Sequence, residues 1–493
     1  MAAPKTSDDP LFDVLRDLLV ALLREASEVE QQLMIQYLYA AFSLKKYPDR
    51  TCSPAQYEAV RRWGSTILLV ARSEMEHLAL VNGMLTAIGE EPFFDRRNIP
   101  KQSTYFRGGN LAKGRDRGRG TEPCDIPFVF EPFSLATIER FVCAESPSKQ
   151  TLVENGLPVP EWCFSCDEAR QEAAVELADS TISDEQWKRA QQALAEVRGA
   201  ALESGDSIRP GTIQELYKLI ELLFVILSSR GNLFTGSPSG QVFIPIEYQI
   251  SVFPITDLSS TKAAIKQIVE EGEGIDAPPD FQSHFLRFFR VRDELVALLE
   301  ADPSFEPSLP LPENPKADQI TNPFAKQLFE LFNYTYATLV FLLTALYRSF
   351  QPQSGQSYPF LSSALQEAAF GPMMTMLIRP IAEIMACTQS GDGVHTTGPD
   401  YHLSPADRNL LAHPDAQLEN IEFFLCRLDE IVRRLDALSA FDLKKAAREE
   451  GDVHFLDRQL RFVYESAAAL ANNTRRIYQV GELPEFVVNP PQS

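Results

Sequence analysis

Glu74 and His77 stand three residues apart in "SEMEHLALVNGML" at residues 73–85, a stretch that is otherwise largely apolar. Side chains three apart lie on the same face of a helix, so this carboxylate and this imidazole would point in one direction. Buried charge is costly unless it is paired or binds a metal ion. The pair alone is weakly specific, because a solvated helix edge gives the same spacing. It indicates a metal site only if further carboxylates face it from other helices.

Further acidic residues and histidines follow in a suggestive order. A dinuclear metal site in a four-helix bundle takes one Glu from each of two helices and a Glu-x-x-His pair from each of the other two. The predicted metal ligands here are Glu30, Glu74, His77, Glu215, Glu270, Glu273 and His284, and Glu74 and Glu215 are also the expected catalytic groups. Taken singly, each glutamate has a plain alternative, such as a capping role for Glu215. Within "IVEEGEG" the choice among Glu270, Glu271 and Glu273 stays open.

His284 can reach the predicted site only if the helix that carries the acidic run is interrupted before it. It follows Glu273 by eleven residues, and "GIDAPPDFQS" lies between them. Gly274, Pro278 and Pro279 in this stretch must interrupt the helix. We therefore expect the chain to leave the bundle after the acidic run and to re-enter it at His284.

The donor set indicates which metal would bind. Carboxylates with one or two imidazoles favour iron or manganese, so we expect a dinuclear iron or manganese site, with dioxygen as a co-substrate if the metal is iron. Tyr37, two turns after Glu30, and Tyr217, next to the Glu215 position, are candidates for supporting the ligands, although ordinary packing would also explain them. Glu76 is expected to face solvent or to lie just behind the ligands.

Long helices are predicted to position these residues. Apolar positions recur at helical spacing over about 11–44 and again over about 53–88, with Pro54 in the first turn of the second helix. Two such helices joined by a short loop suggest an antiparallel pair. A third helix is expected after Gly211 and a fourth from Ser259 or Ser260. The stretch between the second and third helices, at about 95–210, is rich in Gly, Pro and Arg at its start and is predicted to be an irregular insertion.

The chain continues beyond this bundle. Residues 301–324 are proline-rich, which excludes a continuing helix and predicts a linker. Residues 325–493 contain apolar and amphipathic segments at helical spacing, and we expect this C-terminal helical region to pack on the bundle. The predicted domains are therefore residues 1–300, the linker, and residues 325–493, all in an all-α fold.

Composition bounds the function. The 493 residues include 44% hydrophobic residues and carry a net charge of −22, which argues against general nucleic-acid binding. The longest apolar runs fall short of a membrane span, and the N-terminus has no secretory h-region, so a cytoplasmic protein without a membrane partner is expected. Seven cysteines at scattered spacings suit a reducing compartment. Cys163 and Cys166 in "CFSC" are interpreted as free thiols, with a zinc knuckle as the alternative.

Several motifs together resemble a known family. "LREASEVEQQLMIQYLYAAFSL", "SEMEHLALVNGMLTAIGEEP", "GTIQELYKLI", "AAIKQIVEEGEG" with "SHFLRFF", "FGPMMTMLIRPIAEIM" and "TTGPDY" are similar, in this order over about residues 11–415, to the ferritin-like domain of the iminophenyl-pyruvate dimer synthase family. The resemblance implies a ferritin-like four-helix bundle and favours Glu270 as the ligand of the acidic run, with Glu273 as runner-up. One departure is "LMIQY", where the family often has a proline.

The resemblance also directs the functional hypotheses. It implies an enzyme of specialised metabolism that acts on a small, amino-acid-derived molecule. The leading hypothesis is a dinuclear-metal oxidase or oxygenase. The second is metal-independent coupling of two imino acids, in which glutamates act as acid and base. The third is a non-catalytic ferritin-like binding protein. A small-molecule substrate is expected in the first two cases, and a homo-oligomer is compatible with all three.

Overall fold

The computed structural model describes most of the chain. The described residues are 9–102, 127–147, 149–164, 182–198, 210, 213–237, 241–244, 251–274, 283–349, 368–413, 418 and 421–480. They form two compact units, Met1–Leu309 and Pro310–Ser493. Helices dominate both units, and the only strands among the described residues are the two-residue antiparallel pair β1 (Lys101–Gln102) and β2 (Pro127–Phe128). The all-α prediction is confirmed.

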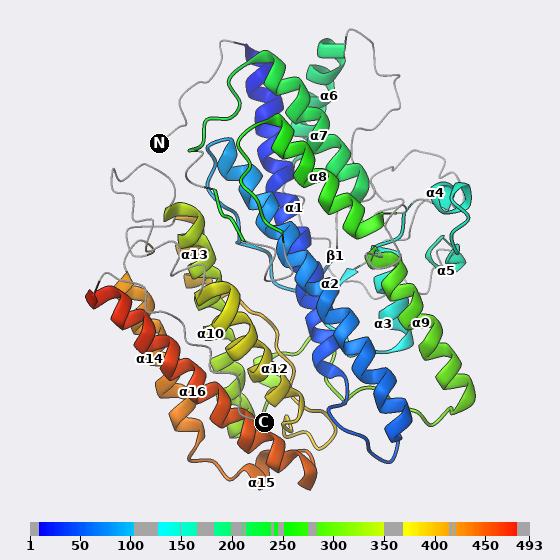
Figure 1. The fold of residues 1–493 in the computed structure, drawn as a ribbon, viewed down its shortest axis with the longest axis vertical. Coiled ribbons are helices and arrows are strands. Elements are labelled where there is room, and N and C mark those ends of the chain that lie inside the picture. Colours follow the sequence, from blue (N-terminus) through cyan, green and yellow to red (C-terminus); the bar gives the residue numbers. More distant parts are fainter. Residues whose placement is uncertain are drawn as a thin grey trace. The chain divides into compact units, whose positions relative to one another are not determined.

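Two long helices form one side of the first unit. They are α1 (Pro10–Ser43) and α2 (Pro54–Ala87), and Ser53 and Gln56 close a capping box at the start of α2. Arg16, near the start of α1, donates to the carbonyl of Ile88, just beyond the end of α2, over 3.0 Å. The two helices are therefore antiparallel and lie side by side (Figure 1). Both predicted helices agree with the structure to within about two residues at each end.

Shorter helices cover this pair in two halves. Towards the start of α1 and the end of α2 lie α7 (Ile213–Arg230) and α8 (Leu258–Glu273), which pack on each other. At the opposite end lie α3 (Leu135–Ala144) and α9 (His284–Ala301), which also pack on each other (Figure 1). The third position of the bundle is thus shared by α7 and α3, and the fourth by α8 and α9. The ends of these four helices converge near the middle of the long pair.

The break between α8 and α9 was expected from the sequence. The first of these helices ends at Glu273 and the second begins at His284, so His284 opens a new helix inside the bundle. Its ring is 3% exposed. The predicted helix break before His284 is confirmed, while the path of the chain between the two helices, at residues 275–282, lies outside the described part.

The long insertion is described only in part. It contains α3, α4 (Lys149–Glu154), α5 (Glu161–Phe164) and α6 (Asp184–Arg198), of which α6 packs on α1. Residues 103–126 of the insertion and Cys166 of the "CFSC" motif lie outside the described residues.

The cysteine interpretation needs correction. Cys143 and Cys163 form a disulfide, so these two are neither free thiols nor zinc ligands. The bond joins α3 to α5 across twenty residues of sequence. Sequence spacing could not reveal it, because two cysteines pair only when the fold brings their Cα atoms to about 4.4–6.8 Å.

The second unit is helical throughout its described elements. These are η4 (Ala317–Gln319), α10 (Pro323–Ser349), the π-helical η6 (Ala369–Ile378), α12 (Arg379–Ala386), α13 (Pro405–Ala412), α14 (Ile421–Leu438), α15 (Leu443–Ala446) and α16 (Glu450–Val480). Among the described residues, α10 is the one helix long and apolar enough to cross a membrane, with a mean hydropathy of 1.3. In the most apolar 18-residue stretch of this helix, 83% is buried inside the protein, which accounts for its apolar composition.

Candidate metal centre

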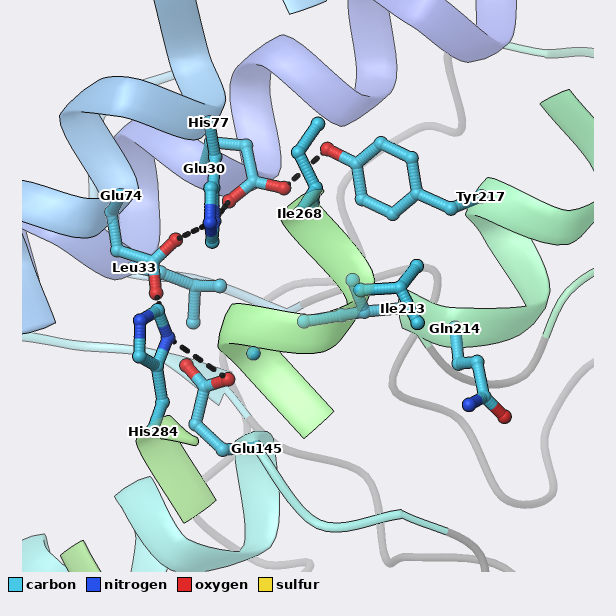
Figure 2. A pocket seen from close by; sticks show the side chains of 12 residues that line it. Glu30, Leu33, Glu74, His77, Glu145, Ile213, Gln214, Tyr217, Ile268 and His284 are labelled. Atoms are coloured by element: carbon cyan, nitrogen blue, oxygen red, sulfur yellow. Dashed lines mark hydrogen bonds and ion pairs between the residues drawn. The ribbon is translucent and has the colours of Figure 1, made fainter. Parts of the chain in front are cut away.

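A first group of ligand atoms joins the two long helices. His77 Nδ1 lies 3.1 Å from a carboxylate oxygen of Glu74 on the same helix and 3.6 Å from one of Glu30 on α1. All three side chains are at most 2% exposed. One donor atom from each residue lies within 4.8 Å of the other two, an arrangement that could hold a metal ion (Figure 2).

A second group shares Glu74 with the first. His284 Nδ1 lies 2.9 Å from Glu74 Oε1 and 3.6 Å from an oxygen of Glu145, the residue that follows α3. Glu74 turns its other oxygen, Oε2, towards His77 (Figure 2). These three buried side chains also place donor atoms within 4.8 Å of one another. Glu74 therefore stands between two ligand groups, as the bridging carboxylate of a dinuclear site does.

The unsatisfied atoms of the cluster fit a metal. Three buried atoms, both ring nitrogens of His284 and Oε1 of Glu74, make no hydrogen bond of acceptable geometry with a described residue. Buried polar atoms are rarely left in this state. They face a cavity of about 20 Å³ among the ligands, which is the size of a water molecule or an ion. A cation in this space would satisfy the donors that protein groups leave open, so the residues present fit a dinuclear site.

Two tyrosines hold the outer carboxylates. The Tyr37 hydroxyl donates to Glu145, and the Tyr217 hydroxyl donates to Glu30. Burial and the neighbouring carboxylates raise the pKa of both phenols well above the usual value, so both keep their protons. The Tyr37 ring packs edge-on against Phe141 of α3 and Phe288 of α9. Tyr37 thus links a ligand on α3 to the packing between α3 and α9.

A third acidic group lies behind His77. The Nε2 atom of His77 lies 3.3 Å from the carboxylate of Glu271 on α8, and Ser73 donates to the same carboxylate over 2.5 Å. Glu76, which is 4% exposed, accepts hydrogen bonds from the backbone amide of Ser251 and from Gln267. A histidine that binds metal through one nitrogen usually donates the other to a carboxylate, which fixes its orientation. Glu271 occupies that place for His77.

Burial and charge shift the protonation of the carboxylates in different directions. Burial and the Glu74 charge raise the pKa of Glu30 to about 7. Burial also works against ionised Glu74, but His284 and His77 outweigh it and lower its pKa. Burial and the Glu271 charge raise the pKa of Glu76 to about 7. Of Glu30, Glu74 and Glu76, Glu74 is thus the carboxylate that stays ionised most readily.

Two of the predicted ligands do not reach this cluster. Glu215 lies exposed in the first turn of α7, so its predicted inward orientation is wrong, and Tyr217 faces the site instead. Glu270 is also exposed, with its carboxylate 3.5 Å from Lys266, and the inward residue of the acidic run is Glu271. The side chain of Glu273 lies outside the described residues.

Periodicity explains both corrections. The buried positions of α8 include Thr261, Ala264, Ile265 and Ile268, and continuing that face by three residues arrives at position 271. The same reasoning places Ile213, Leu216, Tyr217 and Ile220 on the inner face of α7 and leaves position 215 outside. The family motif favoured Glu270, whereas the helical periodicity of the buried positions favours Glu271.

Glu145 is the member of the candidate metal centre that was not predicted from the sequence. It has no histidine at ligand spacing and lies in a segment assigned to an insertion. A signal existed, because Ile138, Phe141 and Val142 form the buried face of α3 and position 145 continues it. Only the packing of α3 on α9 shows that this face meets the ligands of the long helices.

Glu271 offers a test of ligand orientation. Glu271→Gln should weaken metal binding by roughly 10–100-fold, because the amide cannot hold His77 as a carboxylate does. Metal titration followed by equilibrium dialysis measures the change. Glu270→Gln, one residue away and exposed, is the matched control and should bind metal like the wild type. Equal losses in the two variants would contradict the assignment.

The protonation of His284 predicts a pH dependence. Burial disfavours the protonated ring, but Glu74 and Glu145 outweigh it and raise the pKa of His284 to about 9. Below that pH the His284 ring of the metal-free protein carries an extra proton, which must leave before one ring nitrogen has a free lone pair for a metal ion. Metal affinity should therefore fall with falling pH, by about tenfold per unit for each proton released. Calorimetric titration at neutral pH in two buffers of different ionisation enthalpy should show proton release, and identical enthalpies would contradict it.

These features place the chain in a protein family. The family model described as Ferritin-like matches residues 23–293, more than half of the sequence, and the chain belongs to this Ferritin-like family. The matched range contains the five residues of the two ligand groups, from Glu30 to His284, and the side chains that support them, Tyr37, Tyr217 and Glu271. The ferritin-like fold class predicted from the motifs is confirmed.

Two curated relatives and one solved structure are similar to the chain. Dichlorochromopyrrolate synthase from Lentzea aerocolonigenes is 27% identical over 78% of this chain and 36% of its own length. The 2-imino-3-(indol-3-yl)propanoate dimerase from Chromobacterium violaceum is 27% identical over 77% of this chain and 33% of its own length. The chain thus spans about a third of the length of these relatives. A ferritin-like protein from Caulobacter vibrioides covers 81% of this chain at 16% identity, with a TM-score of 0.42. The resemblance drawn from the motifs is confirmed.

Proposed function

We propose that this chain is an oxidoreductase with a dinuclear iron or manganese centre that acts on a small, amino-acid-derived molecule. The observation that carries the proposal is the sharing of buried Glu74 between two ligand groups, one with Glu30 and His77 and one with Glu145 and His284. Such a centre, when bound, would supply oxidation of an organic substrate by dioxygen. The names of the relatives, a synthase and a dimerase of biosynthesis, support a small-molecule substrate.

The chain's own residues would prepare the site for this chemistry. Tyr217 and Tyr37 each hold a proton against an outer carboxylate and fix its orientation. Glu271, which accepts a hydrogen bond from Ser73, would orient His77 through its Nε2 atom. The described residues leave only about 20 Å³ beside the ligands, so an organic substrate would have to lie outside this cavity.

Metal content and dioxygen use test the proposal. Protein prepared without metal and loaded anaerobically with ferrous or manganous ion should retain two ions per chain after desalting. The iron form should then consume dioxygen faster than free ferrous ion in the same buffer. Retention of no metal at either ligand group would overturn the proposal.

The second candidate is coupling of two imino acids without a metal. The name of one relative, the 2-imino-3-(indol-3-yl)propanoate dimerase, supports this candidate. Glu30 supports it as well, because its raised pKa of about 7 suits a group that both takes up and gives up a proton. Product analysis with an imino acid generated in situ separates the two candidates. Dimer formation that survives chelation and complete metal removal favours coupling, and loss of all turnover on chelation favours the metal-dependent reaction.

A further inference from the structure

The Cys143–Cys163 disulfide lies next to one of the two ligand groups. Cys143 is in the last turn of α3, and Glu145, two residues later, places a carboxylate oxygen 3.6 Å from Nδ1 of His284 (Figure 2). The backbone amide of Glu145 donates to the carbonyl of Phe141 over 3.1 Å, so the carboxylate moves with the end of α3. Both cysteines are buried. The disulfide therefore constrains the piece of backbone that carries Glu145.

The partner cysteine belongs to α5, a helix of four residues that also contacts α9. Trp162, next to Cys163, stacks on Phe289 of α9 with the ring centres 6.0 Å apart. The guanidinium carbon of Arg292, also on α9, lies 4.4 Å from the centre of the Trp162 ring. One nitrogen of the same guanidinium lies 3.1 Å from the carboxylate of Glu139 on α3. The disulfide and these contacts thus join α5 to both helices that carry the group of Glu145 and His284.

The other ligand group is positioned in a different way. Glu30, Glu74 and His77 lie in the interior of α1 and α2, which are 34 residues long each and pack directly on each other. Side chains in the interior of two packed helices depend on that packing, whereas Glu145 and His284 lie at helix ends. Release of α5 should therefore loosen Glu145 and His284 and leave Glu30 and His77 in place.

We propose that the Cys143–Cys163 disulfide holds Glu145 against His284, so that the oxidised protein binds two ions tightly and the reduced protein binds one. The inference rests on the proposed dinuclear centre. Reduction by a dithiol supplies two electrons and two protons: the sulfur–sulfur bond breaks, two thiols form, and the dithiol becomes a disulfide. Local opening of the four-residue helix α5 exposes the bond without unfolding the long helices. The two cysteines are positioning residues that act through Glu145.

Metal binding by the oxidised and the reduced full chain tests this proposal. The protein is treated with dithiothreitol, freed of the reagent anaerobically and titrated with ferrous ion, and mass spectrometry of the peptides that contain Cys143 and Cys163 establishes the reduction. One ion should bind as in the oxidised protein and the other about 10–100-fold more weakly. Reoxidation should restore both affinities. Equal weakening of both ions would indicate a general structural role and overturn the proposal, and two unchanged affinities would overturn it as well.

Variants locate the effect of reduction. The double variant Cys143→Ser/Cys163→Ser should bind metal like the reduced protein and should not respond to reoxidation. Cys426→Ser, which removes an exposed free thiol of α14, is the matched control and should respond to reduction like the wild type. In Glu145→Gln, reduction should cause no further loss, because the residue through which the disulfide acts is already altered. Loss of the remaining ion when this variant is reduced would overturn the proposal.

Hydrogen exchange of the metal-free protein separates the role of the disulfide from the proposed metal centre. Reduction should speed the exchange of backbone amides at 143–146 by about tenfold or more, and it should leave exchange at 74–81 in α2 unchanged. Unchanged exchange at 143–146 would overturn the positioning role even if two ions bind. An oxidised protein that retains no metal would overturn the proposed function, whatever the exchange rates are.

Discussion

Replacing Glu74 with glutamine should abolish metal binding by both ligand groups at once. The amide keeps the shape of the side chain but removes the charge, and Glu74 is the one carboxylate in the described part of the chain that approaches both His77 and His284. The loss should exceed the roughly 10–100-fold typical of residues that only orient a ligand. Metal content after anaerobic loading and desalting should fall from two ions per chain to nearly none.

Two further variants make the result specific. Glu145→Gln should affect mainly the group that contains His284, because Glu145 belongs to that group alone. Glu215→Gln, which alters an exposed residue of α7, should retain both ions. If Glu215→Gln loses metal and Glu74→Gln does not, the arrangement of ligands proposed from the structure is wrong. Circular dichroism of each variant establishes that the helices are retained.

The second large effect concerns the packing that carries the ligands. Phe288→Ala should lower the free energy of unfolding by about 3–5 kcal/mol, as expected when a buried aromatic ring is removed. Phe288 is completely buried, one turn after His284, with its ring centre 4.9 Å from that of Tyr37 and 5.4 Å from that of Phe141. The cavity left behind should loosen Tyr37 and His284 together. Denaturant unfolding and metal content measure the two effects.

Phe288→Ala should weaken metal binding by the two ligand groups to different extents. Tyr37 donates to Glu145, so the group of Glu145 and His284 should weaken more than that of Glu30 and His77. Phe288→Leu keeps most of the volume and should cost far less. Phe243→Ala provides the control, because that side chain is 56% exposed and surface changes usually stay within about 0.5 kcal/mol. Equal destabilisation by the alanine variants at 288 and 243 would contradict the packing argument.

The two ligand groups also clarify why the fourth bundle position is interrupted. A continuous helix through residues 258–301 would keep a single phase along its whole length. The break lets Glu271 lie behind His77 at the end of α8, while His284 begins α9 and turns towards Glu74. The interruption that the glycine and prolines predict is thus compatible with a place for His284 in the cluster, because a new helix begins at that residue.

Local sequence patterns determined the helices and four members of the cluster. The long apolar periodicities set α1 and α2, and the three-residue spacing placed Glu74 and His77 on one face, with Glu30 opposite and His284 after a break. Helix phase, read from buried positions alone, would also have favoured Glu271 over Glu270 and Tyr217 over Glu215. These features depend on residues close together in the chain, which is why the sequence carries them.

Tertiary structure alone decided the remaining members. Glu145 joins the site because α3 packs on α9 and Tyr37 reaches across from α1, contacts between residues more than a hundred positions apart. The Cys143–Cys163 disulfide likewise depends on segments that meet only in the folded chain. Spacing along a helix fixes the direction of a side chain relative to its neighbours, but the partner that it faces is set by how the helices pack.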